Sequence, residues 1–181
     1  MVSWQQTARR IRVPLSFVFA AAYLWLAKPE WMFLAAGSLV ALPGLWLRAV
    51  ASGHVHKDTE LATTGPYAYV RNPLYVGSLI LAGGFALAAR SPWVVLLMLL
   101  MFVFVYLPVI RSEEDYLRRT FSEFEEYARR VPRLLPRLRA EKSAQRSFSW
   151  ELYLRHREYN ALLGAAGVMA ALAVKILWFS A

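Results

Sequence analysis

The sequence has 181 residues, room for one domain, and 58% of them are hydrophobic, above the roughly 45–50% of an ordinary soluble domain. It contains no cysteine, which excludes disulfides, thiolate metal sites and a cysteine nucleophile. The formal net charge of +9 comes from basic residues that flank apolar segments. This pattern is typical of positive-inside membrane topology and of contact with anionic lipid, so we predict membrane lipids as partners and no nucleic acid.

Five apolar segments each approach the roughly 20 residues that a helix needs to cross a bilayer. We therefore predict a single domain, residues 1–181, that is all-α: a polytopic integral membrane helical bundle with about five transmembrane helices. The apolar run from Val13 leads into a second one, which favours an uncleaved helical hairpin over a signal peptide. The predicted spans are residues 13–27, 31–50, 74–89, 93–110 and 159–179.

The connections between these segments predict their geometry and orientation. Residues 28–30 and 90–92 read as tight turns, and Pro43 and Pro108 should kink the spans that contain them. With a cytoplasmic N-terminus, all but three of the 21 Lys and Arg residues lie on the inner side, as the positive-inside rule requires. The exceptions are Lys28, Arg90 and Lys175, and we expect Lys175 to snorkel to the outer surface.

Two polar segments, residues 51–72 and 111–158, are predicted to be cytoplasmic. In the second, Ser112 is a candidate N-cap with acidic residues in the following turn, where the helix dipole favours them. The predicted helix is amphipathic and ends at Pro132. Its apolar stripe consists of Leu117, Phe121, Phe124, Ala128 and Val131, and should lie on the membrane surface or cap the bundle.

The run GPYAYVRNPLYVG, from Gly65 to Gly77, is the most informative part of the chain. Gly65-Pro66 predicts a tight turn, whereas Asn72 reads as an N-cap followed by Pro73 at the first helical position. The amides at this helix start could hold an anion such as a carboxylate. The tyrosine side chains offer ring faces and hydroxyls to a flat heterocycle, and Gly77 permits close approach to the backbone. They are Tyr67, Tyr69 and Tyr75.

Polar residues elsewhere in the inner segments add candidates for binding and catalysis. Glu113 and Glu114 follow the fourth span directly, where a carboxylate could hold ribose hydroxyls or face a cation. Arg130 could neutralise an acidic substrate. His54 follows Gly53 at the end of the second span and could contact a cofactor. Too few ligands surround the histidines for a metal site, so we predict none.

Three motifs in this order resemble the membrane-integral methyltransferases typified by isoprenylcysteine carboxyl methyltransferase and phospholipid N-methyltransferase. GPYAYVRNPLYVG resembles the family's GPY…R-[HN]-P-x-Y-x-G, SEEDYL its Glu-Glu signature, and FSEFEEYARRVPRLLP its closing stretch that ends in RVP. The resemblance covers roughly residues 44–138. It implies S-adenosylmethionine as methyl donor, bound at the cytoplasmic side, and an amphiphilic prenyl or lipid substrate.

The resemblance also implies roles for individual residues. In the carboxyl-methylating branch, the arginines that match Arg71 and Arg130 orient the acceptor carboxylate, and Glu114 completes the predicted catalytic set. Asn72 stands where that branch usually has histidine, as in the phospholipid branch. The residues implied to bind the cofactor are Gly65, Tyr67, Asn72, Pro73, Tyr75, Gly77, Glu113 and Glu114, to which we add His54.

The acceptor stays open at this point, because the arginines suit a carboxylate and the glutamates suit an amine that must lose a proton. Two other functions are also compatible with the sequence. Some membrane sterol and steroid reductases, which use NADPH, look similar in this region, although they tend to be longer. A non-catalytic lipid-binding bundle could keep the same loop for structure alone.

Overall fold

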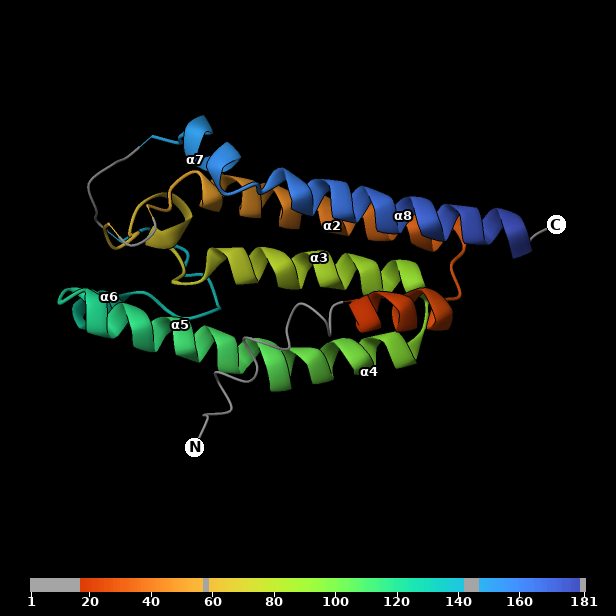
Figure 1. The fold of residues 1–181 in the computed structure, drawn as a ribbon, viewed down its shortest axis with the longest axis horizontal. Coiled ribbons are helices and arrows are strands. Elements are labelled where there is room, and N and C mark those ends of the chain that lie inside the picture. The colour runs from red at the N-terminus through yellow and green to blue at the C-terminus, as the bar shows by residue number, and fades with distance from the viewer. Residues whose placement is uncertain (1–16, 57–58, 142–146, 180–181) are drawn as a thin grey trace. The chain divides into compact units, whose positions relative to one another are not determined.

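The computed structural model describes residues 17–56, 59–141 and 147–179, which contain helices and no strand (Figure 1). The elements in chain order are a first helix Phe17–Leu26, α2 (Trp31–Ser52), the 3₁₀ turn η1 (Gly65–Ala68), α3 (Pro73–Ala89), α4 (Pro92–Met101), the π-helical turn η2 (Phe102–Tyr106), α5 (Leu107–Thr120), α6 (Phe124–Arg130), α7 (Trp150–Arg155) and α8 (Tyr159–Phe179). The all-helical prediction is confirmed.

The five predicted apolar segments are all helical where they are described, with boundaries shifted by a few residues. Three helices are long and apolar enough to cross a membrane: Trp31–Ser52, Pro92–Thr120 and Tyr159–Trp178. Phe17–Leu26 and Pro73–Ala89 are apolar but shorter. Residues 13–16 of the first predicted span lie outside the described part of the chain.

The predicted helix start at Ser112 is wrong. Helix runs without interruption from Pro92 through α5 to Thr120, so Ser112 is an interior residue and the three acidic residues after it are not in a first turn. Neither glycine nor proline follows Pro108 in this stretch, so nothing stops the helix from propagating. The helix breaks at residues 121–123, and α6 ends before Pro132 as predicted.

The two prolines within spans have different surroundings. Helix α2 continues through Pro43 from Trp31 to Ser52. Pro108 instead lies two residues after the end of η2, where the Leu107 amide donates to the Phe102 carbonyl. Because Pro108 has no amide to donate to the carbonyl four residues earlier, the local ladder cannot stay regular, and a π turn is one known way to accommodate this.

The chain divides into two compact units, which we describe separately. The first consists of the described parts of Met1–Val40, Ala82–Tyr116 and Ala166–Ala181. Its core contains aromatic, aliphatic and alanine side chains from five helices and from the turn after the first helix. These are Tyr23, Ala27, Leu34, Ala88, Ala89, Val94, Leu172 and Ile176.

The two predicted tight turns meet in this first unit. The Lys28 amide donates to the Ala89 carbonyl at 2.7 Å, and Arg90 forms an ion pair with Glu30. The Arg90 guanidinium also lies over the Phe33 ring, 5.2 Å from its centroid. The turns therefore link the two hairpins by backbone and side-chain contacts.

Lys175 on α8 binds the end of the first helix. Its ammonium donates to the carbonyls of Leu24, Trp25 and Ala27, at 2.6, 3.2 and 2.7 Å. We expected this side chain to snorkel to the surface. Its ammonium satisfies carbonyls that a helix C-terminus leaves without intrahelical donors, where the helix dipole favours a cation, and its place at a membrane surface stays a prediction.

Glycines allow α2 and α3 to approach closely. In the first unit, a Cβ on Gly37 would lie 2.5 Å from the Gly84 carbonyl and 2.8 Å from Ala88. In the second unit, a Cβ on Gly44 would lie 2.7 Å from the Gly77 carbonyl. Such spacing is typical of small-residue packing between membrane helices. Gly83 differs, because a Cβ there would meet nothing within 4 Å.

The second unit consists of the described parts of Ala41–Leu81 and Leu117–Ala165. Its core is formed by Phe124, Tyr127 and Val131, with Leu61, Leu117, Phe121 and Ala128 packed against it. All members of the predicted apolar stripe therefore gather in one cluster, although they come from α5, from α6 and from the residues next to these helices and not from a single helix.

We predict that Gly37→Ala lowers the free energy of unfolding by about 1–3 kcal/mol, because the added methyl group would overlap the α3 backbone. Gly83→Ala is the matched control. It should be neutral or stabilising by up to about 1 kcal/mol, since alanine is the better helix former and meets no neighbour there. Thermal unfolding of both variants in detergent measures the difference, and equal shifts would contradict this packing.

We also predict that Lys175→Met lowers the free energy of unfolding by about 1.5–3 kcal/mol, the range for hydrogen bonds to a charged group. Val174→Met, an exposed neighbour on the same helix, is the control and should change stability little. Hydrogen exchange at residues 24–27 should rise only in the Lys175 variant. Unchanged exchange there would rule out the capping role.

Candidate functional site

The loop that begins at Gly65 folds as the sequence predicts. Residues Gly65–Ala68 form η1, and Gly65 has a φ of +57°, in the left-handed region that favours glycine. A Cβ on Gly65 would also lie 2.6 Å from the His54 ring. His54 and Gly65 are therefore in contact. Both were predicted to bind the cofactor, although they are not adjacent in the sequence.

The His54 ring is held against the loop from the other side as well. Its Nδ1 lies 2.8 Å from the Val50 carbonyl, so Nδ1 carries the proton if this contact is a hydrogen bond. That tautomer turns Nε2, the nitrogen nearer Gly65, into an acceptor. His54 is buried, and its ring packs against the loop at Gly65.

Helix α3 begins at Pro73, as predicted. The Asn72 carbonyl accepts hydrogen bonds from the amides of Tyr75 and Val76, at 3.0 and 3.1 Å. The Asn72 side chain has a long-range contact as well, because its Nδ2 donates to the Arg133 carbonyl at 3.2 Å. Asn72 thus starts α3 with its backbone and holds the distant RVP segment with its side chain.

The loop and the segment after α6 are clasped together by their backbones. Three main-chain hydrogen bonds join residues that are more than 60 positions apart in the sequence. They run from the Arg71 amide to the Pro132 carbonyl (2.8 Å), from the Arg137 amide to the Tyr69 carbonyl (3.0 Å) and from the Glu141 amide to the Ala68 carbonyl (2.9 Å). We call this set the backbone clasp.

A buried side chain strengthens the same contact. The Tyr127 hydroxyl donates to the Tyr67 carbonyl at 2.8 Å, and both residues are buried. Since a buried carbonyl without a donor is costly, Tyr127 ties the α6 core to the loop. The GPY and RVP motifs, read separately from the sequence, therefore belong to one structural element of the second unit.

The predicted arginines differ in their surroundings. Arg71 is partly buried beside Asn72, and its amide is fixed by the backbone clasp. The Arg130 side chain is 49% exposed and forms ion pairs with Glu126 and Glu141, at 3.3 and 3.2 Å. Arg130 would have to exchange these partners before it could bind a substrate carboxylate.

The predicted acidic pair lies on α5, in the first unit. Glu114 is only 2% exposed, whereas Glu113 is partly buried. A carboxylate is rarely buried so fully unless it is paired or hydrogen-bonded. Glu114 is thus the more distinctive of the two, and their place beside the loop of the second unit stays a prediction.

The tyrosine side chains of the loop are not equivalent. Tyr67 is buried, Tyr69 is exposed and Tyr75 is partly buried at the first turn of α3. Gly77, one turn later, lies against Arg48: a Cβ there would approach the Arg48 Cγ to 2.6 Å. In this structure the space that Gly77 provides is used by another helix.

Among the described residues, no group of three or more His, Asp and Glu is arranged to hold a metal ion. His56 forms an ion pair with Glu60 at 3.0 Å. His156 places its Nδ1 3.0 Å from the Ser52 carbonyl. Each of these side chains thus has a contact of its own within the protein.

The sequence analysis missed Arg48 and Glu158, which form an ion pair with an N–O distance of 2.6 Å. A signal was present, because ionisable residues within or next to membrane spans are rare and often functional. It also missed residues 148–156, which pack on the end of α2. The Phe148 ring lies against Gly53, and the Ser149 amide donates to the Gly53 carbonyl at 3.0 Å.

Comparison with known proteins identifies the segment that contains the loop. Residues 44–123 match the phospholipid methyltransferase family. This range includes the GPY motif and the Glu-Glu motif, and it ends before RVP. No solved structure matches the chain.

Three relatives share parts of the sequence. The nickel-cobalt-cadmium resistance protein NccN of Alcaligenes xylosoxydans xylosoxydans is 44% identical over 52% of this chain and 43% of its own length. The cobalt-zinc-cadmium resistance protein CzcN of Cupriavidus metallidurans is 41% identical over 56% of this chain and 46% of its own. The protein-S-isoprenylcysteine O-methyltransferase of Schizosaccharomyces pombe is 38% identical over 45% of this chain and 35% of its own length.

The chain thus spans less than half the length of each of these relatives. The matched family segment nevertheless contains the GPY loop, which is one of the two segments that the backbone clasp joins. These matches support a relationship between residues 44–123 and the membrane methyltransferases, which include the phospholipid and isoprenylcysteine enzymes.

Proposed function

We propose that this protein transfers a methyl group from S-adenosylmethionine to a carboxylate or an amine of an amphiphilic molecule in the membrane. The observation that carries the proposal is the backbone clasp, which brings the GPY loop and the RVP segment together. Loop residues held this firmly suit a binding site, because little ordering is needed when a ligand arrives.

The chemistry of the loop fits the methyl donor. The start of α3 offers amides and a positive dipole end to the donor's carboxylate. Tyr67 and Tyr75 supply aromatic faces for its adenine, and His54 closes one side. The buried carboxylate of Glu114 suits ribose hydroxyls or a sulfonium cation. When bound, the donor supplies an electrophilic methyl group.

In such a reaction the protein would position the two reactants and exclude water from them. Arg71, with its backbone fixed, would hold an anionic acceptor at one side of the loop. A carboxylate acceptor is ionised at neutral pH and needs no base. An amine acceptor must give up a proton, which Glu113 or Glu114 would accept. Fixing both reactants in line contributes up to several kcal/mol towards lowering the barrier.

The two candidate acceptors are supported by different residues. Arg71 and Arg130 suit a carboxylate acceptor, and Arg130 would first have to exchange its ion pairs with Glu126 and Glu141. Asn72, which stands where the carboxyl-methylating branch usually has histidine, favours the phospholipid branch and an amine. Two relatives are named for resistance to metal ions. Such names describe an effect on the cell and are compatible with methyl transfer as the underlying reaction.

Calorimetry on the full-length protein in detergent tests the donor. We expect S-adenosylmethionine to bind with about micromolar to millimolar affinity, the usual range for enzyme substrates, and NADPH not to bind. Binding of NADPH alone would replace this proposal with a reductase. Binding of neither would favour a non-catalytic lipid-binding protein.

We predict that Arg71→Ala and Glu114→Ala each reduce methyl transfer by about a hundredfold or more, because misplacing a reactant by an ångström costs about that much. The matched controls are Arg155→Ala and Glu151→Ala, which change exposed residues of α7. Transfer is measured with membranes and a radiolabelled donor. Base treatment then distinguishes the acceptors, since methyl esters release methanol and methylated amines do not.

Intact folding is checked in the same preparations by circular dichroism. Full activity in both site variants would show that the pocket is elsewhere. Loss of activity in the controls as well would point to instability and not to a site.

A further inference from the structure

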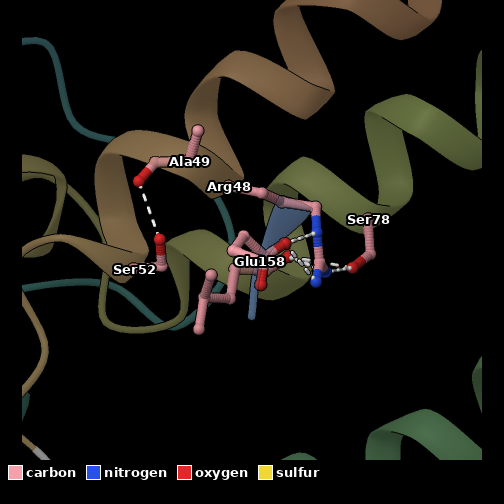
Figure 2. Close-up of polar contacts among 6 residues, drawn as sticks. Arg48, Ala49, Ser52, Ser78 and Glu158 are labelled. Atoms are coloured by element: carbon pink, nitrogen blue, oxygen red, sulfur yellow. Dashed lines mark hydrogen bonds and ion pairs between the residues drawn. The ribbon is translucent and has the colours of Figure 1, made fainter. Parts of the chain in front are cut away.

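Arg48 on α2 is a charged residue at the centre of a polar network in the second unit. Its Nε donates to Glu158 Oε1 at 2.6 Å, and its Nη2 lies 2.6 Å from the same oxygen (Figure 2). The two side chains are 22% and 11% exposed. An ion pair this well buried is strongly disturbed when one partner is removed, because the other charge stays behind.

The opposite edge of the guanidinium reaches α3. Nη1 donates to Ser78 Oγ at 2.5 Å and to the Leu74 carbonyl at 3.3 Å. Ser78 in turn donates to the Leu74 carbonyl at 2.9 Å, and Figure 2 shows the Arg48 side chain between Glu158 and Ser78. With Gly77 packed on the Arg48 Cγ, Arg48 contacts the first two turns of α3.

Glu158 is itself held in place by its own segment. Its amide donates to the Tyr153 carbonyl at 3.4 Å, and the preceding Arg157 has a φ of +53°. Helix α8 begins at Tyr159, directly after Glu158. Nearby, His156 Nδ1 meets the Ser52 carbonyl of α2, so the acceptor for Arg48 is positioned by contacts independent of the ion pair.

We propose that Arg48 is a positioning residue: held by Glu158, it fixes the first two turns of α3 and thereby sets the loop at Gly65–Gly77 for its ligand. The ligand's identity as S-adenosylmethionine rests on the proposed function. The role of Arg48 does not, because it concerns the order of α3 itself. The planar guanidinium suits this role, since its donors point at two partners at once, whereas a lysine ammonium could not reproduce that fork.

The inference also gives the last helix a function. Residues 124–181 lie beyond the matched family segment, yet Glu158 from this part neutralises the arginine that contacts α3. The start of α8 is thereby connected to the start of α3, which carries the predicted cofactor residues Pro73 and Tyr75.

Hydrogen–deuterium exchange on the protein without ligand tests the positioning directly. The reporters are the amides of Tyr75 and Val76, which bond to the Asn72 carbonyl. We expect exchange to rise about tenfold in Arg48→Lys and Glu158→Gln, and about fivefold in Ser78→Ala, in line with the loss of charged and neutral hydrogen bonds. Glu125→Gln, which removes an exposed ion pair with Arg118, is the control and should leave these amides unchanged.

Calorimetry with S-adenosylmethionine on the same variants adds the second readout. Ser78→Ala should weaken binding about fivefold at temperatures far below its unfolding transition, where the variant is fully folded, which a purely structural role would not produce. Unchanged exchange in both Arg48→Lys and Ser78→Ala would overturn the positioning role. Faster exchange with unchanged donor affinity would overturn its link to the ligand.

The two proposals fail in different ways. If the wild-type protein binds no S-adenosylmethionine, the proposed function is wrong, and exchange still decides whether Arg48 orders α3. If the wild-type protein binds the donor and the variants behave like it in both measurements, only the role of Arg48 is wrong. Should Arg48→Lys fail to fold, Ser78→Ala alone decides, because it removes one hydroxyl and is otherwise conservative.

Discussion

The main-chain hydrogen bonds between residues 68–71 and residues 132–141 are the constraint on which the rest of the site depends. An irregular loop next to an apolar helix has few ways to satisfy its amides and carbonyls, and an unsatisfied buried group is costly. The loop meets this requirement by pairing with a second irregular segment from the far side of α6. Tyr127 adds a side-chain donor from the core of the second unit. Two segments that are individually unstable thus stabilise each other.

The sequence predicted those features of the fold that are encoded locally. Apolar segments of sufficient length predicted the helices, Asn72-Pro73 predicted the start of α3, and Gly65-Pro66 predicted the turn at η1. The start of a helix at Ser112 was predicted wrongly, because a good N-cap residue is equally compatible with the interior of a helix that nothing interrupts. Which of Gly83 and Gly84 meets α2 depends on the rotation of α3 against its neighbour, and no local pattern records that rotation.

The sequence predicted which segments come together but not which residues that are far apart in the sequence contact one another. The motifs indicated that the GPY loop and the RVP segment act together. The structure joins them through backbone hydrogen bonds. Because every residue type carries the same backbone groups, the sequence does not reveal such pairing. Arg48 and Glu158 are 110 positions apart. Glu158 taken alone reads as an ordinary interfacial charge. Their approach in space connects the residue that precedes α8 with the first turns of α3, and the proposed ordering of α3 rests on this contact.

The use of backbone atoms in the clasp has a consequence for how this site can change over evolutionary time. Side chains at Ala68, Tyr69 and Arg137 contribute nothing to those three bonds beyond the peptide groups that they share with every residue. Substitutions that keep these amides and carbonyls therefore leave the three bonds in place, whereas proline at Arg71, Arg137 or Glu141 would remove a donor. The backbone pairing can thus persist while the side chains around it change.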